Sequence, residues 1–110
     1  MRVVTWNVNG IRAAIRKGMD DWMAKIDADV WLLQEVRALP EQLPKDWELP
    51  SEHEVVWHPA EKKGYSGVAS FSRVGMEEIT RGIDTELDPD DLEGRVLTTK
   101  SGGLTCINIY

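Results

Sequence analysis

The sequence contains a single cysteine, Cys106, and this scarcity limits both the chemistry and the setting of the protein. One cysteine excludes an internal disulfide, so a reducing cytoplasm is the expected setting. Long apolar runs are also missing, because the longest uncharged one, around residues 30–33, is far too short to span a bilayer. The N-terminus passes directly from Met1 and Arg2 into a strand-like segment, so no secretory signal is visible.

An excess of positive charge is absent as well, since the 110 residues carry a formal net charge of −6. Proteins that simply coat nucleic acid depend on clustered lysine and arginine, and this surface would on average repel phosphate. An acidic chain can still bind DNA through one local basic patch, or hold a metal ion with its carboxylates. The glycine-rich phosphate loop, the serine nucleophile elbow and zinc-ligand spacings are all missing from the sequence.

The apolar pattern of the first third predicts a strand, a helical region and a second strand. Residues 2–8 are rich in β-branched and aromatic side chains, as in a buried strand. From residue 11 to 26 the apolar positions have helical spacing, and Gly18 predicts two short helices or one kinked helix. Residues 29–34 carry consecutive apolar side chains, as expected of a strand covered on both faces. The unit has the length of a parallel crossover connection.

The rest of the chain predicts further short strands. The candidates are residues 54–58, 68–72, 76–81, 95–100 and 104–110, the last two joined by a hairpin at Ser101-Gly102-Gly103. The proline-containing stretch 38–50 is expected to be irregular or a short helix, and the acidic stretch 84–94 a solvated loop. The sequence therefore predicts an α/β fold in one domain over residues 1–110, with six or seven strands in a mixed sheet packed by helices.

Asn7 and Glu35 follow the two strands that the helical region joins. If those strands are parallel neighbours, both side chains emerge at one edge of the sheet, where ligand sites of open α/β sheets form. A carboxylate and a carboxamide there are suitable oxygen ligands for Mg²⁺. The alternative, which spacing alone leaves open, is that Asn7 starts a turn and Glu35 is a surface residue.

Two basic segments are candidates for phosphate contact. Arg12, Arg16 and Lys17 lie in the first helical turns, where they fit either phosphate binding or a solvated helix face. The loop 62–67 combines two lysines with Gly64 and Tyr65, which suits insertion against a nucleic-acid backbone. The alternative is a hairpin loop whose tyrosine packs on the core edge.

The aromatic and imidazole side chains carry weaker signals. Three tryptophans lie on apolar faces and are expected in the core: Trp6, Trp22 and Trp31. The other two, Trp47 and Trp57, remain open between core packing and base stacking. His53 and His58 flank a strand with no partner at metal-ligand or triad spacing, so ordinary surface or edge histidines are expected. Cys106 is expected to be inert core.

Taken together, five ordered segments resemble the exonuclease III and abasic-site endonuclease family. They are 5–13 (TWNVNGIRA), 33–35 (LQE), 63–69 (KGYSGVA), 93–96 (EGRV) and 107–110 (INIY). The resemblance implies the N-terminal half of a DNase I-like α/β sandwich with two layered sheets. It also implies an Mg²⁺-dependent nuclease, with Mn²⁺ as a substitute, that cleaves double-stranded DNA at abasic sites and trims 3′ ends. A monomer is expected for the full-length form.

The same resemblance implies roles for individual residues. Glu35 would bind the catalytic Mg²⁺, and Asn7 would orient the metal site and the scissile phosphate. Five positions match DNA contacts: Arg12, Ala13, Lys17, Gly64 and Tyr65. Tyr110 matches the tyrosine whose hydroxyl approaches the scissile phosphate. Asn9 matches a position near the metal, and Arg95 is expected to support the fold.

The chain departs from the family in two motifs. The family's G-D-x-N and S-D-H motifs, which position the attacking water, do not occur in this sequence. Because the chain ends inside a strand pattern, we expect a truncated product that is inactive alone and aggregation-prone at 104–110. Two alternatives remain. One is another phosphodiesterase or phosphatase of the same superfamily, although the G-Y-S-G-V loop and Arg12 favour the DNA-repair branch. The other is a non-catalytic DNA-binding or pseudogene product.

Overall fold

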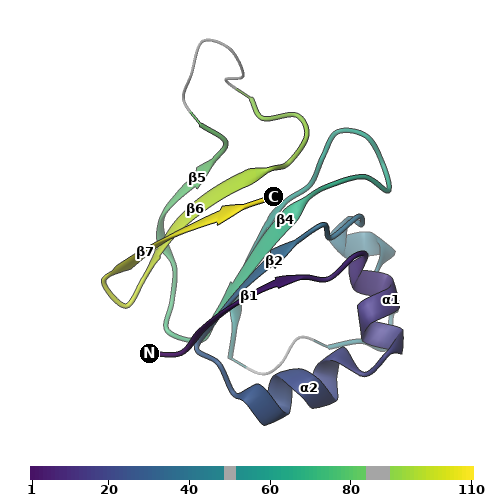
Figure 1. The fold of residues 1–110 in the computed structure, drawn as a ribbon, viewed down its shortest axis with the longest axis horizontal. Helices are drawn as coiled ribbons and strands as arrows, with labels where there is room; N and C mark the ends of the chain where they lie inside the picture. Colours follow the sequence, from purple (N-terminus) through teal and green to yellow (C-terminus); the bar gives the residue numbers. More distant parts are fainter. Residues whose placement is uncertain (49–51, 84–89) are drawn as a thin grey trace.

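The structure is a computed structural model that describes residues 1–48, 52–83 and 90–110 of the chain. Its elements in chain order are β1 (Val3–Asn7), α1 (Ile11–Arg16), α2 (Met19–Ile26), β2 (Val30–Gln34), the 3₁₀ helix η1 (Pro40–Gln42), β3 (Glu54–His58), β4 (Val68–Ser72), β5 (Glu77–Arg81), β6 (Val96–Ser101) and β7 (Leu104–Ile109). Figure 1 shows these elements in sequence colours. The expected strands are all present within one or two residues of their predicted bounds.

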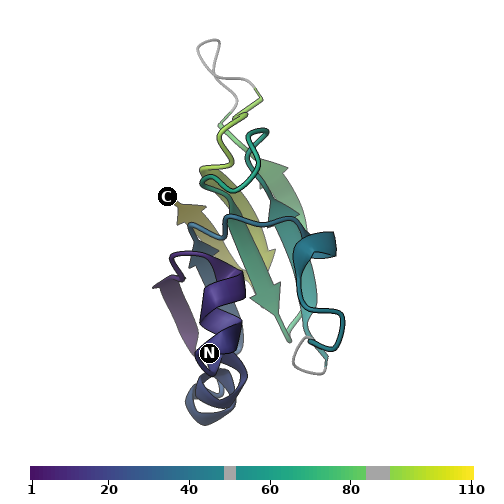
Figure 2. The same cartoon turned by 90° about the vertical axis from the view of Figure 1, so that its right-hand side faces the viewer.

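The strands form two sheets, which confirms the α/β class. The first sheet has the order β1-β2-β4-β3, and the second has the order β5-β6-β7. Strands β1 and β2 pair in parallel through the helical crossover, and the other pairings are antiparallel. The second sheet packs on the face of the first that the helices leave uncovered (Figure 2).

Gly18 divides the helical region into two helices, as its position predicts. Its backbone is left-handed, with φ of 97° and ψ of 30°, which a residue with a side chain rarely adopts. The N–H of Gly18 donates to the carbonyl of Ile15 and closes the end of α1, and α2 begins at Met19. The break allows both short helices to bury their apolar residues against one sheet face.

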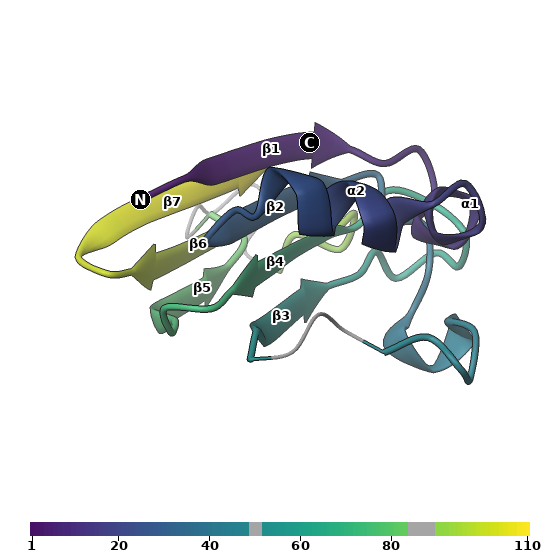
Figure 3. The same cartoon turned by 90° about the horizontal axis from the view of Figure 1, so that it is seen from below.

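Strand β2 is buried on both faces and connects two hydrophobic clusters. Trp31 and Leu33 share a hydrophobic cluster with residues of α1 and α2, and α2 lies beside β2 in Figure 3. Val30 and Leu32 point to the opposite face, where Cys106 of β7 packs against them. Burial raises the pKa of the Cys106 thiol, which fits an inert core residue. The unbroken apolar run of β2 therefore reflects contacts with both layers.

Two expectations about burial are wrong, those for Asp91 and Trp22. Asp91 of the expected solvated loop is 3% exposed and pairs with His58, which is 7% exposed at the end of the edge strand β3, so His58 is an edge histidine and not a surface one. Trp22 is 41% exposed, although its ring contacts Trp6 and Trp31 at centroid distances of 4.6 and 5.6 Å. The burial of Asp91 depends on a partner 33 residues away in the sequence, which the local pattern does not reveal.

Two predicted segments are only partly described. In the stretch 38–50, η1 supplies the short helix that was expected, and residues 49–50 lie outside the described residues. Residues 84–89 of the expected acidic loop also lie outside them. Across the ranges that the structure describes, the helices are too short and too polar for any to cross a membrane.

Candidate functional site

Asn7 and Glu35 meet at the carboxyl edge of the parallel pair, as the crossover predicts. Asn7 lies opposite Gln34 in the register of β1 and β2, and Glu35 follows directly. The Asn7 side-chain nitrogen donates to Glu35 Oε1 over 3.2 Å, and Asn7 Oδ1 accepts from the backbone N–H of Asn9 over 2.9 Å. The two side chains therefore converge as predicted, and Asn7 also starts the turn that the alternative expected, whereas Glu35 is not an exposed surface residue.

The backbone turns sharply at Glu35. Its φ of 54° is left-handed, as is the φ of 57° at Arg37, and side chains seldom tolerate this region. The turn leaves the Glu35 side chain only 12% exposed and brings its second oxygen, Oε2, into an ion pair with Arg37. The carboxylate is thus held between an amide and a guanidinium.

Backbone hydrogen bonds bring three of the motif segments together. The N–H groups of Gly10 and Ile11 donate to the carbonyls of Glu35 and Val36 over 2.8 and 2.9 Å. The loop before β4 joins on the other side, where the Arg37 N–H donates to the Ser66 carbonyl over 2.8 Å. Segments that are distant in sequence therefore form one rigid edge around Glu35.

A shallow hollow of about 430 Å³ beside this edge is strongly basic. Its lining residues are Asn9, Gly10, Arg12, Ala13, Arg16, Arg37 and Gly64. Three arginines and no carboxylate face it, although the chain as a whole is acidic. Three of the predicted DNA contacts, at positions 12, 13 and 64, thus share one surface. The hollow is a local basic patch on a chain whose formal net charge is −6.

Lys17 lies in the adjoining hollow, which shares Asn9 and Ala13 with the basic one. Its other neighbours there include Trp6 and Trp22. The predicted DNA contacts of α1 and of Lys17, which follows it, therefore lie along two adjoining hollows that pass from arginines to an exposed tryptophan.

Tyr65 and Tyr110 are brought together by Arg95. The guanidinium donates to the Tyr65 hydroxyl over 2.9 Å and lies over the Tyr110 ring, 5.2 Å from its centroid. Arg95 Nε also donates to Glu93 Oε2 over 2.6 Å, and this bond lowers the pKa of Glu93 and raises that of Arg95. The two predicted tyrosines thus belong to one cluster.

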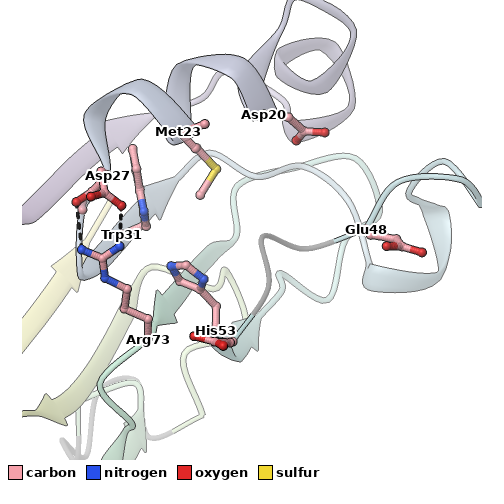
Figure 4. A pocket seen from close by; sticks show the side chains of 10 residues that line it. Asp20, Met23, Asp27, Trp31, Glu48, His53 and Arg73 are labelled. Carbon is pink, nitrogen blue, oxygen red and sulfur yellow. Dashed lines mark hydrogen bonds and ion pairs between the residues drawn. The ribbon is translucent and has the colours of Figure 1, made fainter.

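A separate hollow of about 400 Å³ lies between α2 and the segment before β3, and Figure 4 shows its lining side chains. Four carboxylates border it: Asp20, Asp27, Glu48 and Glu52. Arg73 lies at one side of it and pairs with Asp27 at 2.5 Å (Figure 4). None of the predicted site residues lines this hollow, and its negative charge contrasts with the basic hollow beside Glu35.

Sequence reasoning missed Arg37 and the full role of Arg95. Arg37 stands two residues after Glu35, and no spacing rule marks such a neighbour as its ion-pair partner, because only the left-handed turn brings the two together. Arg95 was expected to support the fold, which its contacts bear out, but these contacts also reach both site tyrosines. The E-G-R-V segment was the available signal for it.

For a metal ion, the site offers one carboxylate beside one carboxamide. In the part of the chain that the structure describes, no three His, Cys, Asp or Glu residues cluster in a way that could hold a metal. A closed all-protein cage is therefore not present in these ranges. A single carboxylate does suit Mg²⁺, which keeps several waters and takes further oxygens from phosphate.

Known proteins match the chain over its whole length. An exodeoxyribonuclease from Bacillus subtilis is 38% identical, and a DNA repair nuclease from Danio rerio is 36% identical. The chain is covered completely in both, and it spans 42% and 36% of their lengths. A solved Neisseria 3′ phosphatase, bound to a product DNA hairpin, has a TM-score of 0.83 and 28% identity, with 100% and 41% of the two chains covered.

The model of the endonuclease/exonuclease/phosphatase family matches residues 4–105. That range contains Asn7, Glu35 and the basic hollow. The fold, with its two layered sheets, agrees with the same assignment. The chain therefore belongs to the endonuclease/exonuclease/phosphatase family.

Proposed function

We propose that the protein containing this chain hydrolyses phosphodiester bonds of double-stranded DNA in repair, at abasic sites and at 3′ ends. The observation that carries the proposal is the Asn7–Glu35 pair beside a hollow lined by three arginines. The names of the relatives, an exodeoxyribonuclease and a DNA repair nuclease, support the same reaction class. The product DNA bound by the Neisseria phosphatase supports DNA as the substrate.

In this proposal the Glu35 carboxylate binds Mg²⁺, with Mn²⁺ as a substitute, and Asn7 fixes the orientation of that carboxylate. When bound, the ion withdraws charge from the phosphate and stabilises the charge that develops during hydrolysis. Arg37 pairs with the second carboxylate oxygen of Glu35, which leaves Oε1, the oxygen that accepts from Asn7, for the ion. The Tyr110 hydroxyl approaches the scissile phosphate.

The DNA backbone lies along the basic hollow in this arrangement. Arg12, Ala13 and Lys17 contact phosphates from α1, and Gly64 and Tyr65 contact the duplex from the loop before β4. Charge complementarity supports this path, because the hollow on the α2 side is bordered by four carboxylates and would repel phosphate.

We further propose that residues 1–110 form part of a single monomeric nuclease domain and are inactive alone. The chain spans 42% of the Bacillus relative, and the sequence contains neither motif that positions the attacking water in the family. Loss of groups that position a nucleophile costs orders of magnitude in rate. Residues 1–110 alone would then bind DNA without cleaving it.

The test uses the full-length protein and a duplex with one abasic site, assayed with Mg²⁺ and with EDTA. Glu35→Gln should lower kcat/KM by about 100-fold or more, since it removes the charge on the one carboxylate that the described residues bring to the site. Glu41→Gln, a change at an exposed carboxylate of η1, is the matched control. Retained activity in Glu35→Gln, or cleavage of a phosphoinositide in place of the duplex, would refute the proposal.

DNA binding can be tested separately from cleavage. Arg12→Ala should weaken duplex binding and reduce the slope of log K against log salt by roughly 1, the value for one lost phosphate contact. Arg73→Ala, which removes an arginine on the acidic side, should leave the slope unchanged. An unchanged slope in Arg12→Ala would exclude this path for the backbone.

A further inference from the structure

Arg95 makes contacts with both tyrosines of the site and with its own acidic neighbour. Its Nη2 donates to the Tyr65 hydroxyl over 2.9 Å, and Nε donates to Glu93 over 2.6 Å. The guanidinium carbon lies 5.2 Å from the Tyr110 ring centroid and 5.9 Å from that of Tyr65. We propose that Arg95 is a positioning residue that holds Tyr110 for the reaction and couples it to the Tyr65 loop.

The main chain adds to the restraint on Tyr110. The backbone N–H of Tyr110 donates to the Arg95 carbonyl over 2.8 Å, and Arg95 Nη1 lies 3.4 Å from the Tyr110 carbonyl oxygen. Tyr110 is 39% exposed and Tyr65 is 37% exposed, so core packing alone does not fix either ring. A planar, permanently charged group between them restricts both rings.

The position of Arg95 is itself fixed from the core. Asp91 Oδ2 accepts hydrogen bonds from the backbone N–H groups of Arg95 and Val96, over 2.9 and 2.8 Å. The same oxygen lies 2.9 Å from His58 Nε2 in β3. Asp91 and His58 are both buried, so this junction ties the segment that carries Arg95 to the first sheet.

Gly94 permits this close approach. A Cβ at position 94 would lie 2.7 Å from the backbone atoms of residues 58–60, a distance that real Cβ atoms do not reach. The segment can therefore press against the end of β3 only with glycine before Arg95. The close approach explains the glycine of the E-G-R-V segment. Gly94 lets the chain pass next to β3, and the following residue, Arg95, then lies over the Tyr110 ring.

Arg95 is better suited to orient Tyr110 than to bind phosphate itself. Its charge is already paired with Glu93, which would repel an approaching phosphate. Two of its donors are occupied by Glu93 and Tyr65. Because the Tyr65 loop is a proposed DNA contact, a duplex that moves Tyr65 acts on Tyr110 through this arginine. The coupling role rests on the proposed function, but the packing of Arg95 on Tyr110 does not.

The first experiment reports on packing alone. 3-Fluorotyrosine is placed at position 110 of the full-length protein, and its ¹⁹F resonance is recorded in wild type, Arg95→Ala and Arg73→Ala. Arg73 is a matched control, because it is also ion-paired but belongs to the acidic hollow. The ¹⁹F chemical shift should change in Arg95→Ala and remain that of the wild type in Arg73→Ala. A resonance that stays in Arg95→Ala overturns the inference, whatever the activity.

The second experiment is a double-mutant cycle on the abasic duplex. Arg95→Ala should lower kcat by roughly 10- to 100-fold with KM little changed, as expected when a reacting group is misplaced. In a Tyr110→Phe background the same change should cost less than about threefold, because Arg95 acts through the missing hydroxyl. A full additive loss would mean that Arg95 acts on substrate directly or only stabilises the fold, and would overturn the inference.

The two readouts also separate the inference from the proposed function. If the ¹⁹F resonance moves while the wild-type protein cleaves no DNA, the nuclease proposal fails and the positioning of Tyr110 by Arg95 stands. Should Arg95→Ala not fold, Arg95→Lys serves in its place, because it keeps the charge but lacks the planar fork. The ¹⁹F chemical shift should change in that variant too, and an unchanged chemical shift overturns the inference.

Discussion

The side chain of Asn108 in β7 accepts a 2.7 Å hydrogen bond from Gln34 Nε2 in β2, so one amide–amide contact joins the two sheets. Asn108 Nδ2 donates in turn to the carbonyls of Leu33 and Ala69, over 3.1 and 3.0 Å. Asn108 is 1% exposed. Because Gln34 immediately precedes Glu35, the same contact also supports the candidate site.

Replacing this buried amide should destabilise the protein strongly. Asn108→Ala removes one of the acceptors of Gln34 Nε2 and the side-chain donor to two carbonyls, and we expect the free energy of unfolding to fall by about 2–4 kcal/mol. Urea denaturation followed by tryptophan fluorescence measures it. Thr105→Ala, at an exposed position of the same strand, should change stability by less than about 0.5 kcal/mol. Equal effects of the two changes would contradict the prediction.

Two costs of adding a side chain at Gly94 can be measured separately: the steric collision with β3 and the strain of a left-handed φ. Gly94 and Gly103 both have left-handed φ, 61° and 80°, but a Cβ at Gly103 would have no atom within 4 Å. Gly103→Ala should therefore cost only the left-handed strain, about 1–2 kcal/mol. Gly94→Ala should cost clearly more, because its methyl group collides with backbone. Thermal unfolding of the two variants makes the comparison, and similar losses would show that the collision is relieved without cost.

Asp29 should make stability depend on pH in the acidic range. A hydrogen bond from the Arg2 backbone N–H, together with the Arg73 guanidinium, lowers the pKa of Asp29 in the folded protein. A lowered pKa means that the stabilisation is complete above the ordinary value of about 3.9 and is lost as pH falls through the folded value. Asp29→Asn should thus be less stable than the wild type at pH 7, and the difference between their free energies of unfolding should become smaller towards pH 3. Urea midpoints of the wild type and the variant across this pH range test the prediction. A difference between them that does not change with pH would rule out this linkage.

Strand β7 should drive self-association of the isolated chain. Ile107 and Ile109 are 58% and 61% exposed, and among the described residues β7 pairs only with β6. An apolar, unpaired strand edge is a template for pairing with another chain. Ile107→Lys combined with Ile109→Lys should shift residues 1–110 towards monomer in sedimentation velocity. If the wild-type chain is already monomeric at micromolar concentration, the prediction that β7 drives self-association is wrong.

The local pattern of the sequence determined most of the elements. The apolar run of β2, the helical spacing of residues 11–26 and the break at Gly18 predict their structures because each depends on neighbouring residues. The crossover length predicts parallel pairing of β1 and β2, and with it the meeting of Asn7 and Glu35. The five ordered segments, read together, predict the family, and its match over residues 4–105 confirms it.

Only the tertiary structure decided which partners the polar groups have. The pairing of His58 with Asp91 spans 33 residues, and the contact of Asn108 with Gln34 spans 74. No local periodicity encodes such distances, because they depend on how two sheets stack. The left-handed turns at Glu35 and Arg37 likewise occur where the N–H groups of Val36 and Arg37 donate to the carbonyls of Gly67 and Ser66 in the loop before β4. The sequence therefore predicted which residues to examine as a site, and packing between distant segments decided how Asn7 and Glu35 meet.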